Sequence, residues 1–163
     1  MASAISNGTK AVHSNARLIE TLYVSLRDGN PQAITACYAS DAHFEDTAFR
    51  LKSGIEILQM WRFVCSWKSK IAFDSIAADD EQGTGHWVAG YTISENGRWV
   101  ENHTTSQFRF RDGRIIYQFD HSNALAWAAQ VYPLPKSLAA GLVGPLRRWI
   151  ARRKLKEFCG NPD

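Results

Sequence analysis

The sequence has little of what marks several large classes of protein. Its three cysteines, Cys37, Cys65 and Cys159, are odd in number and far apart, without a C-x-x-C pair, which indicates reduced thiols rather than a disulfide framework. No apolar run approaches the ~18 residues that a membrane-spanning helix needs. Eleven glycines and five prolines exclude a collagen-like chain. There is no phosphate-binding loop, dinucleotide fingerprint or metal-ligand spacing, so we expect no cofactor and no metal.

The composition is that of an ordinary globular domain. The chain has 163 residues, of which 45% are hydrophobic and 21% charged, enough to bury a core without metals or disulfides. Residues 1–10 are small and polar, and they lack the basic-then-apolar pattern of a secretory signal. We therefore expect a flexible N-terminus at 1–10, a main domain at 11–132, a helical tail at 133–163, and a cytoplasmic protein.

Positive charge is concentrated in the tail. The net charge is +3, but six basic residues lie in one short window: Arg147, Arg148, Arg152, Arg153, Lys154 and Lys156. Outside that window acidic residues are in excess, and no nucleic-acid-binding motif is present, so we expect no nucleic-acid partner. Apolar residues recur beside these charges at helical spacing: Leu142, Val143, Leu146, Trp149 and Ile150. Such a stripe packs on the domain or on a partner subunit more often than on a membrane. A tail helix that lies across the mouth of a cavity would also keep water out of the cavity.

Hydrophobic periodicity and turn residues predict the order of the elements. Helical spacing covers 12–26, a second short helix at 31–38 is capped by Asn30, and Ser53 opens a third helix that carries Trp61. A strand is expected at 43–48, followed by period-two strands at 70–79, 85–94, 98–111 and 114–120. Helices are expected at 123–131 and from Gly144 to about Phe158. Three helices followed by an antiparallel meander predict an α+β domain with helices on one curved sheet.

Strand parity locates a pocket. In the strand 98–111, Phe108 and Phe110 place the even positions inward. Further back this face turns polar, at Ser106, Thr104 and Asn102. Polar groups on a core face cost desolvation free energy unless water or a ligand meets them, so this end of the face predicts a cavity.

The first hairpin adds aromatic walls to that cavity. A two-residue turn at Asn96-Gly97 would pair Tyr91 with Asn102 and Trp87 with Ser106. Cross-strand partners share a face, so both aromatic rings are expected to point inward.

The second hairpin has two possible registers. A two-residue turn at 112–113 places Asp120 opposite Thr105, facing outward. A three-residue loop with a bulge places Asp120 opposite Thr104, facing the cavity, and Gln118 also turns inward. Apolarity favours the outward position, since the odd positions of this strand are the more apolar set: Ile115, Tyr117 and Phe119.

Two segments carry a resemblance to a known family. "YASDAHFED" and "FRFRDGRIIYQFDH", with the order of elements over about 10–132, resemble the nuclear transport factor 2-like superfamily, and its SnoaL-like branch in particular. The resemblance implies a cone-shaped curved sheet with three N-terminal helices on its concave face, here with extra C-terminal helices. The superfamily includes ketosteroid isomerases, polyketide cyclases and limonene-epoxide hydrolases.

The resemblance also implies roles for individual residues. Asp46 matches the proton-shuttling aspartate of ketosteroid isomerases, whose two oxyanion donors fall on Leu22 and Ser106 here. Asp120 matches the acid/base aspartate of SnoaL-type cyclases, which favours the register that turns it inward. Ala89 stands where epoxide hydrolases carry an acid, so their Asp-Arg-Asp set is incomplete.

The candidate catalytic residues are therefore Asp46 and Asp120, and each has a structural alternative. Asp46 could be a strand-end acid bonded to backbone amides, and Asp120 could cap the following helix. The candidate ligand-binding residues could instead form an internal network with water. These residues are Trp61, Trp87, Tyr91, Asn102, Thr104, Ser106, Phe108 and Gln118.

Two functions follow as expectations. The first is a cofactor-independent isomerase, cyclase or hydrolase that binds a small apolar cyclic molecule and uses aspartate acid/base chemistry. The second is a non-catalytic binding or dimerisation module. In either case a homodimer through the outer sheet face is expected, with Trp99, Tyr117 and Phe119 available there.

Overall fold

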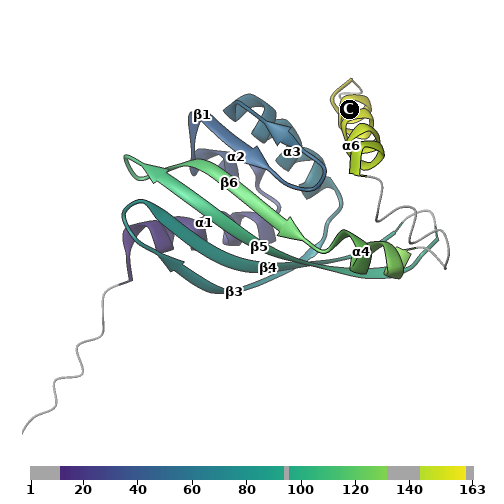
Figure 1. Ribbon diagram of the computed structural model, residues 1–163, viewed down its shortest axis with the longest axis horizontal. Helices are drawn as coiled ribbons and strands as arrows, with labels where there is room; N and C mark the ends of the chain where they lie inside the picture. Colours follow the sequence, from purple (N-terminus) through teal and green to yellow (C-terminus); the bar gives the residue numbers. More distant parts are fainter. Residues whose placement is uncertain (1–11, 94–95, 132–143, 161–163) are drawn as a thin grey trace, which may run out of the picture.

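Helices and strands follow one another along the chain in the predicted order (Figure 1). The computed structural model describes residues 12–93, 96–131 and 144–160. The segment predicted to be flexible, 1–10, lies outside the described residues, as does the link between the main domain and the last helix. The α+β class is confirmed, with a curved, unclosed sheet that carries helices on one face.

The first three helices are α1 (Ser14–Arg27), α2 (Pro31–Ala36) and α3 (Gly54–Ser66). Two of them, α2 and α3, begin at their predicted capping residues, and α1 begins after His13. The Asn30 side chain accepts a hydrogen bond from the backbone N–H of Ala33, and Ser53 accepts one from that of Glu56. The Glu56 carboxylate accepts one from the backbone N–H of Lys52, the residue before the cap, so the predicted capping-box pair stabilises the start of this helix.

Six strands form one sheet in the order β2-β1-β6-β5-β4-β3. The strands are β1 (Tyr38–Glu45), β2 (Arg50–Leu51), β3 (Lys70–Ala78), β4 (Gln82–Thr92), β5 (Trp99–Arg111) and β6 (Arg114–Ser122). Neighbours are antiparallel except β1 and β6, which run parallel. The predicted antiparallel meander is confirmed for β3 to β6, and β1 adds a parallel neighbour to β6. β1 begins at Tyr38, where a helix was predicted to continue.

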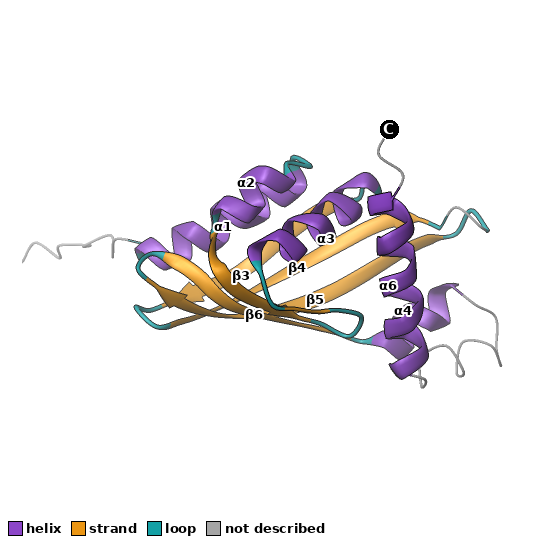
Figure 2. Ribbon diagram, turned by 90° about the horizontal axis from the view of Figure 1, so that it is seen from above, coloured by secondary structure: helices purple, strands orange, loops and turns teal. Residues whose placement is uncertain are grey.

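Register shifts accompany the curvature of the sheet. The β3–β4 pairing slips by one residue between Asp74 and Ala77, where Ser75 adopts a φ of 54°. A second slip lies in β6, between Ile115 and Tyr117. Bulges of this kind bend a strand and increase its twist, and α1, α2 and α3 lie along the resulting concave face (Figure 2).

The core forms where α1 packs on β3 and β4. Ile19 and Tyr23 of α1 are fully buried, and both lie against glycines of β4. A Cβ atom on Gly85 would stand 2.6 Å from the Tyr23 hydroxyl oxygen, and one on Gly83 would stand 2.8 Å from Cδ1 of Ile19. Glycine therefore permits the close approach of helix and sheet.

The β4–β5 hairpin differs from the predicted register by two residues. Trp87 pairs with Thr104, and Tyr91 pairs with Val100. The turn is longer than two residues, because the backbone N–H of Ile93 donates to the Arg98 carbonyl oxygen at 2.8 Å. A shift of two leaves each side chain on its predicted face, since the side-chain period of a strand is two.

The β5–β6 hairpin combines features of both predicted registers. Asp112 and Gly113 have φ values of 52° and 68°, which makes a two-residue turn, and the three-residue loop is wrong. The bulge after Ile115 then reverses the side-chain alternation, so that Ser106 pairs with Asp120. Asp120 is buried on the inner face, and the prediction from apolarity that it faces outward is wrong.

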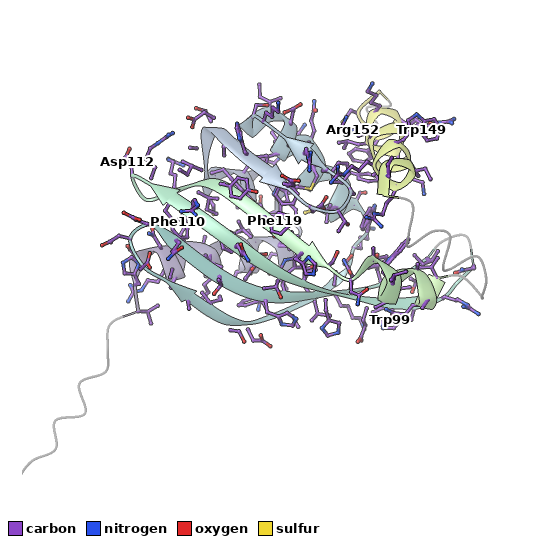
Figure 3. The ribbon with its side chains drawn as sticks, viewed as in Figure 1. Trp99, Phe110, Asp112, Phe119, Trp149 and Arg152 are labelled. Atoms are coloured by element: carbon purple, nitrogen blue, oxygen red, sulfur yellow. The ribbon has the colours of Figure 1, made fainter. Side chains whose placement is uncertain are left out.

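Two helices complete the described chain. α4 (Ala124–Val131) follows β6, and α6 (Gly144–Gly160) lies beside α3, where Phe158 meets Phe63 with ring centroids 5.5 Å apart. Packing of the predicted stripe on the domain is wrong at Trp149 and Ile150, which are 58% and 41% exposed, and Trp149 points away from α3 (Figure 3). The alternative, packing on a partner subunit, stays a prediction. The rest of that stripe, Leu142, Val143 and the Leu146 side chain, lies outside the described residues. No helix within the described part of the chain meets the length and apolarity of a membrane span.

Candidate functional site

A cavity of about 220 Å³ lies among the inner face of the sheet, α3, α4 and the start of α6. Its walls are largely aromatic, with rings from β1, α3, β4 and α4. The aromatic lining residues are Phe44, Phe49, Trp61, Trp67, Trp87, Tyr91 and Trp127. Few polar groups reach the cavity, as is usual for a small-molecule site.

Seven of the ten predicted site residues line this cavity. They are Asp46, Trp61, Trp87, Tyr91, Asn102, Thr104 and Asp120. Ser106, Phe108 and Gln118 do not line it, and their contact with a ligand stays a prediction. These three lie behind the cavity wall and are fully or almost fully buried, because α1 closes on this part of the sheet and fills it with side chains.

Asp120 is a buried carboxyl group at the cavity wall. Burial raises the pKa of Asp120 to about 7, because the charged form loses its hydration. Hydrogen bonds from Ser106 and Gln118 oppose this rise, and the nearby charge of Asp46 adds to it. The Gln118 side-chain amide donates to Oδ1 of Asp120 at 2.7 Å. Near neutral pH both the acid and the carboxylate form are therefore populated.

A chain of buried hydrogen bonds holds Gln118 in that position. The Trp61 indole N–H donates to the Tyr38 hydroxyl at 3.2 Å, and the Tyr38 hydroxyl donates to Oε1 of Gln118. This orientation leaves the Gln118 NH₂ group to donate to Asp120. Tyr38 was missed at the sequence level because it falls where a helix was expected to end.

The helix-capping alternative for Asp120 is wrong. Oδ1 of Asn123 accepts the hydrogen bond from the backbone N–H of Ala126 at the start of α4, so another residue caps this helix.

Asp46 has the backbone hydrogen bonds of its structural alternative and also faces the cavity. It lies where β1 turns into β2, and Oδ1 accepts hydrogen bonds from the backbone N–H groups of Ala48, at 2.6 Å, and Phe49. The carboxyl group also lines the cavity. Burial raises the pKa of Asp46, whereas the two amide bonds and the charges of Arg147 and Arg148 lower it. Asp46 is thus a backbone-bonded carboxylate that faces the same cavity as Asp120.

The far wall contains groups that sequence reasoning did not single out. The Trp127 indole N–H donates to the Tyr91 hydroxyl at 2.8 Å, which joins α4 to β4. The buried Ser69 hydroxyl lines the cavity and has no hydrogen-bond partner among the described residues. Arg147 reaches the cavity from α6. The basic window marked the position of Arg147, but no local pattern distinguished it from the solvated charges beside it.

The Tyr23 hydroxyl lies behind the cavity near the same carboxyl group. It is fully buried, and among the described residues it has no hydrogen bond of ordinary geometry. Burial raises the pKa of the Tyr23 hydroxyl, and the negative charge of Asp120 adds to this rise. A hydrogen bond with the Ser106 hydroxyl opposes it. Tyr23 therefore stays protonated beside Asp120.

Metal ligation has no support within the described residues, where no group of three or more His, Cys, Asp or Glu side chains is placed to hold an ion.

Solved structures with a similar fold come from several bacteria. IdmH, a proposed polyketide cyclase from Streptomyces antibioticus, is 22% identical with a TM-score of 0.63, over 73% of this chain and 99% of its own. An LEH-like epoxide hydrolase from M. tuberculosis is 21% identical with a TM-score of 0.58, over 82% and 95%. A proposed isomerase from Bacillus subtilis is 14% identical with a TM-score of 0.62, over 72% and 92%. At these identities the likeness establishes the fold.

No curated protein matches the chain significantly. A sequence profile does match it: the SnoaL-like domain profile aligns with residues 19–118, which include Asp46 and most of the cavity-lining strands. That match spans more than half of the chain. The chain belongs to the SnoaL-like domain family.

Proposed function

We propose that this protein is an acid/base enzyme of the isomerase or cyclase kind, which acts on a small apolar cyclic compound with a carbonyl or hydroxyl group. One observation carries the proposal: a buried carboxyl group, Asp120, has a pKa near 7 and faces an aromatic-walled cavity. A catalytic acid or base works best when its pKa is close to the working pH.

The chemistry is a proton transfer at carbon. The Asp120 carboxylate takes a proton from a carbon next to a carbonyl group and returns it at the same or another position. Asn102 and Thr104 line the cavity on the neighbouring strand and orient the substrate by hydrogen bonds. Asp46 is the second carboxylate, and its charge raises the pKa of Asp120.

The size of the cavity bounds the substrate. An apolar cavity of ~150 Å³ holds benzene, so about 220 Å³ accommodates one substituted ring. The names of structural neighbours, a polyketide cyclase, an isomerase and an epoxide hydrolase, support this class of reactions on cyclic compounds.

Hydrogen–deuterium exchange at carbon tests the proposal without a known substrate. A panel of cyclic ketones is incubated in D₂O with the wild type, Asp120→Asn and, as a control, Asp112→Asn, whose side chain lies in the exposed turn. We expect Asp120→Asn to slow enzyme-dependent exchange about 100-fold or more, and the control to match the wild type. Exchange that survives in Asp120→Asn refutes the assignment.

A non-catalytic module that dimerises through the sheet is the second candidate. The supporting observation is Trp99, which is 48% exposed at the end of β5 (Figure 3). In that case sedimentation shows a dimer that Trp99→Ser weakens, and no ketone of the panel exchanges deuterium faster with the wild type than with Asp120→Asn. The proposed cytoplasmic location applies equally to both candidates.

A further inference from the structure

The first turn of α6 brings a positive charge to the cavity. Arg147 is the one positively charged side chain among the described residues that line it. Its Nε–H donates to the backbone carbonyl of Thr47 at 3.3 Å, in the same loop that holds Asp46. Arg147 is half-buried, so its charge is less screened than that of the exposed basic residues farther along α6.

A second arginine adds to the positive potential there. Arg148 has a buried Nε without a hydrogen-bond partner among the described residues. The charges of both Arg147 and Arg148 act on Asp46. Asp46 and Asp120 are the two acids among the described lining residues. Arg147 brings a half-buried guanidinium group to the same cavity, where it can meet an anionic group of a ligand.

We propose that Arg147 binds an oxygen anion of the substrate, so that the cavity selects a one-ring compound that carries a carboxylate or forms an enolate. This inference rests on the proposed function in taking the cavity as the substrate site. A guanidinium group presents donors in a planar fork that suits a carboxylate or an enolate oxygen.

The enolate case follows from the electron balance of the proton transfer. Asp120 takes the proton from carbon, the C–H electron pair forms the carbon–carbon double bond, and the carbonyl electron pair moves onto oxygen. That oxygen then carries the negative charge, which Arg147 stabilises. Return of the proton reverses each change, so no oxidant, reductant or co-reactant is required.

Arg147 lies outside residues 19–118, the part of the chain that the SnoaL-like profile matches. The anion-binding group therefore comes from a helix that this chain adds to the family domain. In this arrangement α6 closes the cavity and determines which substrates it admits.

Binding of two one-ring probes tests the carboxylate case. Benzoate and its neutral analogue benzamide are titrated by NMR into the wild type, Arg147→Gln, Arg147→Lys and the control Arg152→Gln, whose side chain is exposed on the same helix. We expect Arg147→Gln to weaken benzoate about 10- to 100-fold and benzamide less than about 2-fold. Arg147→Lys should keep a preference for benzoate, which separates loss of charge from loss of folding. Unchanged benzoate affinity in Arg147→Gln, or an equal loss in Arg152→Gln, contradicts the carboxylate case.

Deuterium exchange of cyclohexanone, a neutral ketone, tests the enolate case. We expect Arg147→Gln to lower the exchange rate at saturating ketone about 10-fold or more, while Arg147→Lys retains part of it. If neither the benzoate preference nor the exchange rate depends on Arg147, the inference is overturned. If the wild type exchanges no ketone while benzoate binding depends on Arg147, the proposed function fails and the anion site remains.

Discussion

Replacement of Asp120 by asparagine should change how the stability of the protein depends on pH. The neutral carboxyl group is tolerated in its buried position, whereas the carboxylate is not, so folding raises the pKa of Asp120 from 3.8 to about 7. Each tenfold change in the acid dissociation constant corresponds to ~1.4 kcal/mol in the free energy of unfolding. The difference between the folded and the unfolded pKa of Asp120 therefore amounts to about 4 kcal/mol.

The sign follows from proton linkage. Below pH 4 Asp120 is protonated in both the folded and the unfolded chain, so its ionisation does not change the free energy of unfolding. Between pH 4 and pH 7 the unfolded chain ionises first, so the wild type loses stability as the pH rises, and above pH 7 the loss is complete. Asparagine is neutral throughout and accepts the Gln118 hydrogen bond through its own side-chain oxygen.

Urea unfolding of the wild type and Asp120→Asn at pH values from 4 to 8 measures this difference. We expect the stability of Asp120→Asn relative to the wild type to increase by about 4 kcal/mol between pH 4 and pH 7.5. The control Asp112→Asn, at the exposed turn, should follow the wild type. If the curves of Asp120→Asn and the wild type run parallel over this range, Asp120 titrates as an ordinary acid and the reasoning is refuted.

Two other substitutions test the electrostatics and the packing behind the site. Asp46→Asn should lower the pKa of Asp120, because the negative charge of Asp46 raises that pKa. NMR titration of the Asp120 carboxyl carbon measures the change. An unchanged or higher pKa contradicts the coupling of the two acids. Gly85→Ala should destabilise the protein by about 1–3 kcal/mol in urea unfolding, because the new Cβ would stand 2.6 Å from the Tyr23 hydroxyl oxygen. Gly144→Ala, where a Cβ meets nothing within 4 Å, is its control, and equal stabilities of the two variants would argue against a close helix–sheet contact.

Local patterns in the sequence predicted most of the fold. Caps such as Asn30 and Ser53 mark helix starts because their side chains satisfy backbone N–H groups within a few residues. The alternation of aromatic and polar residues in β5 identified the inner face correctly, even though the hairpin register was off by two. An error of two residues in the predicted strand register leaves every side chain on the same face of the sheet, so the same side chains are expected to face the cavity.

The direction of Asp120 was not predictable from apolarity. Ile115 and Phe119 read as one apolar face in a regular strand, but the bulge after Ile115 places them on opposite faces. A bulge inserts a single residue and leaves no strong local signal, so it became visible in the structure alone. The resemblance to SnoaL-type cyclases indicated the inward direction of Asp120, although the three-residue loop that it favoured is wrong.

Local sequence patterns were enough to predict the α+β class, the order of the elements and the inner face of β5, because propensity, capping and period-two alternation act over a few residues. The two candidate acids came from the family resemblance. Tertiary structure decided which residues share the cavity. It placed Ser106 and Gln118 behind the wall as hydrogen-bond partners of Asp120, and it brought Arg147 of α6 within reach of Asp46. The physical reason is that desolvation and charge coupling depend on distances between segments far apart in the chain, which no local pattern encodes.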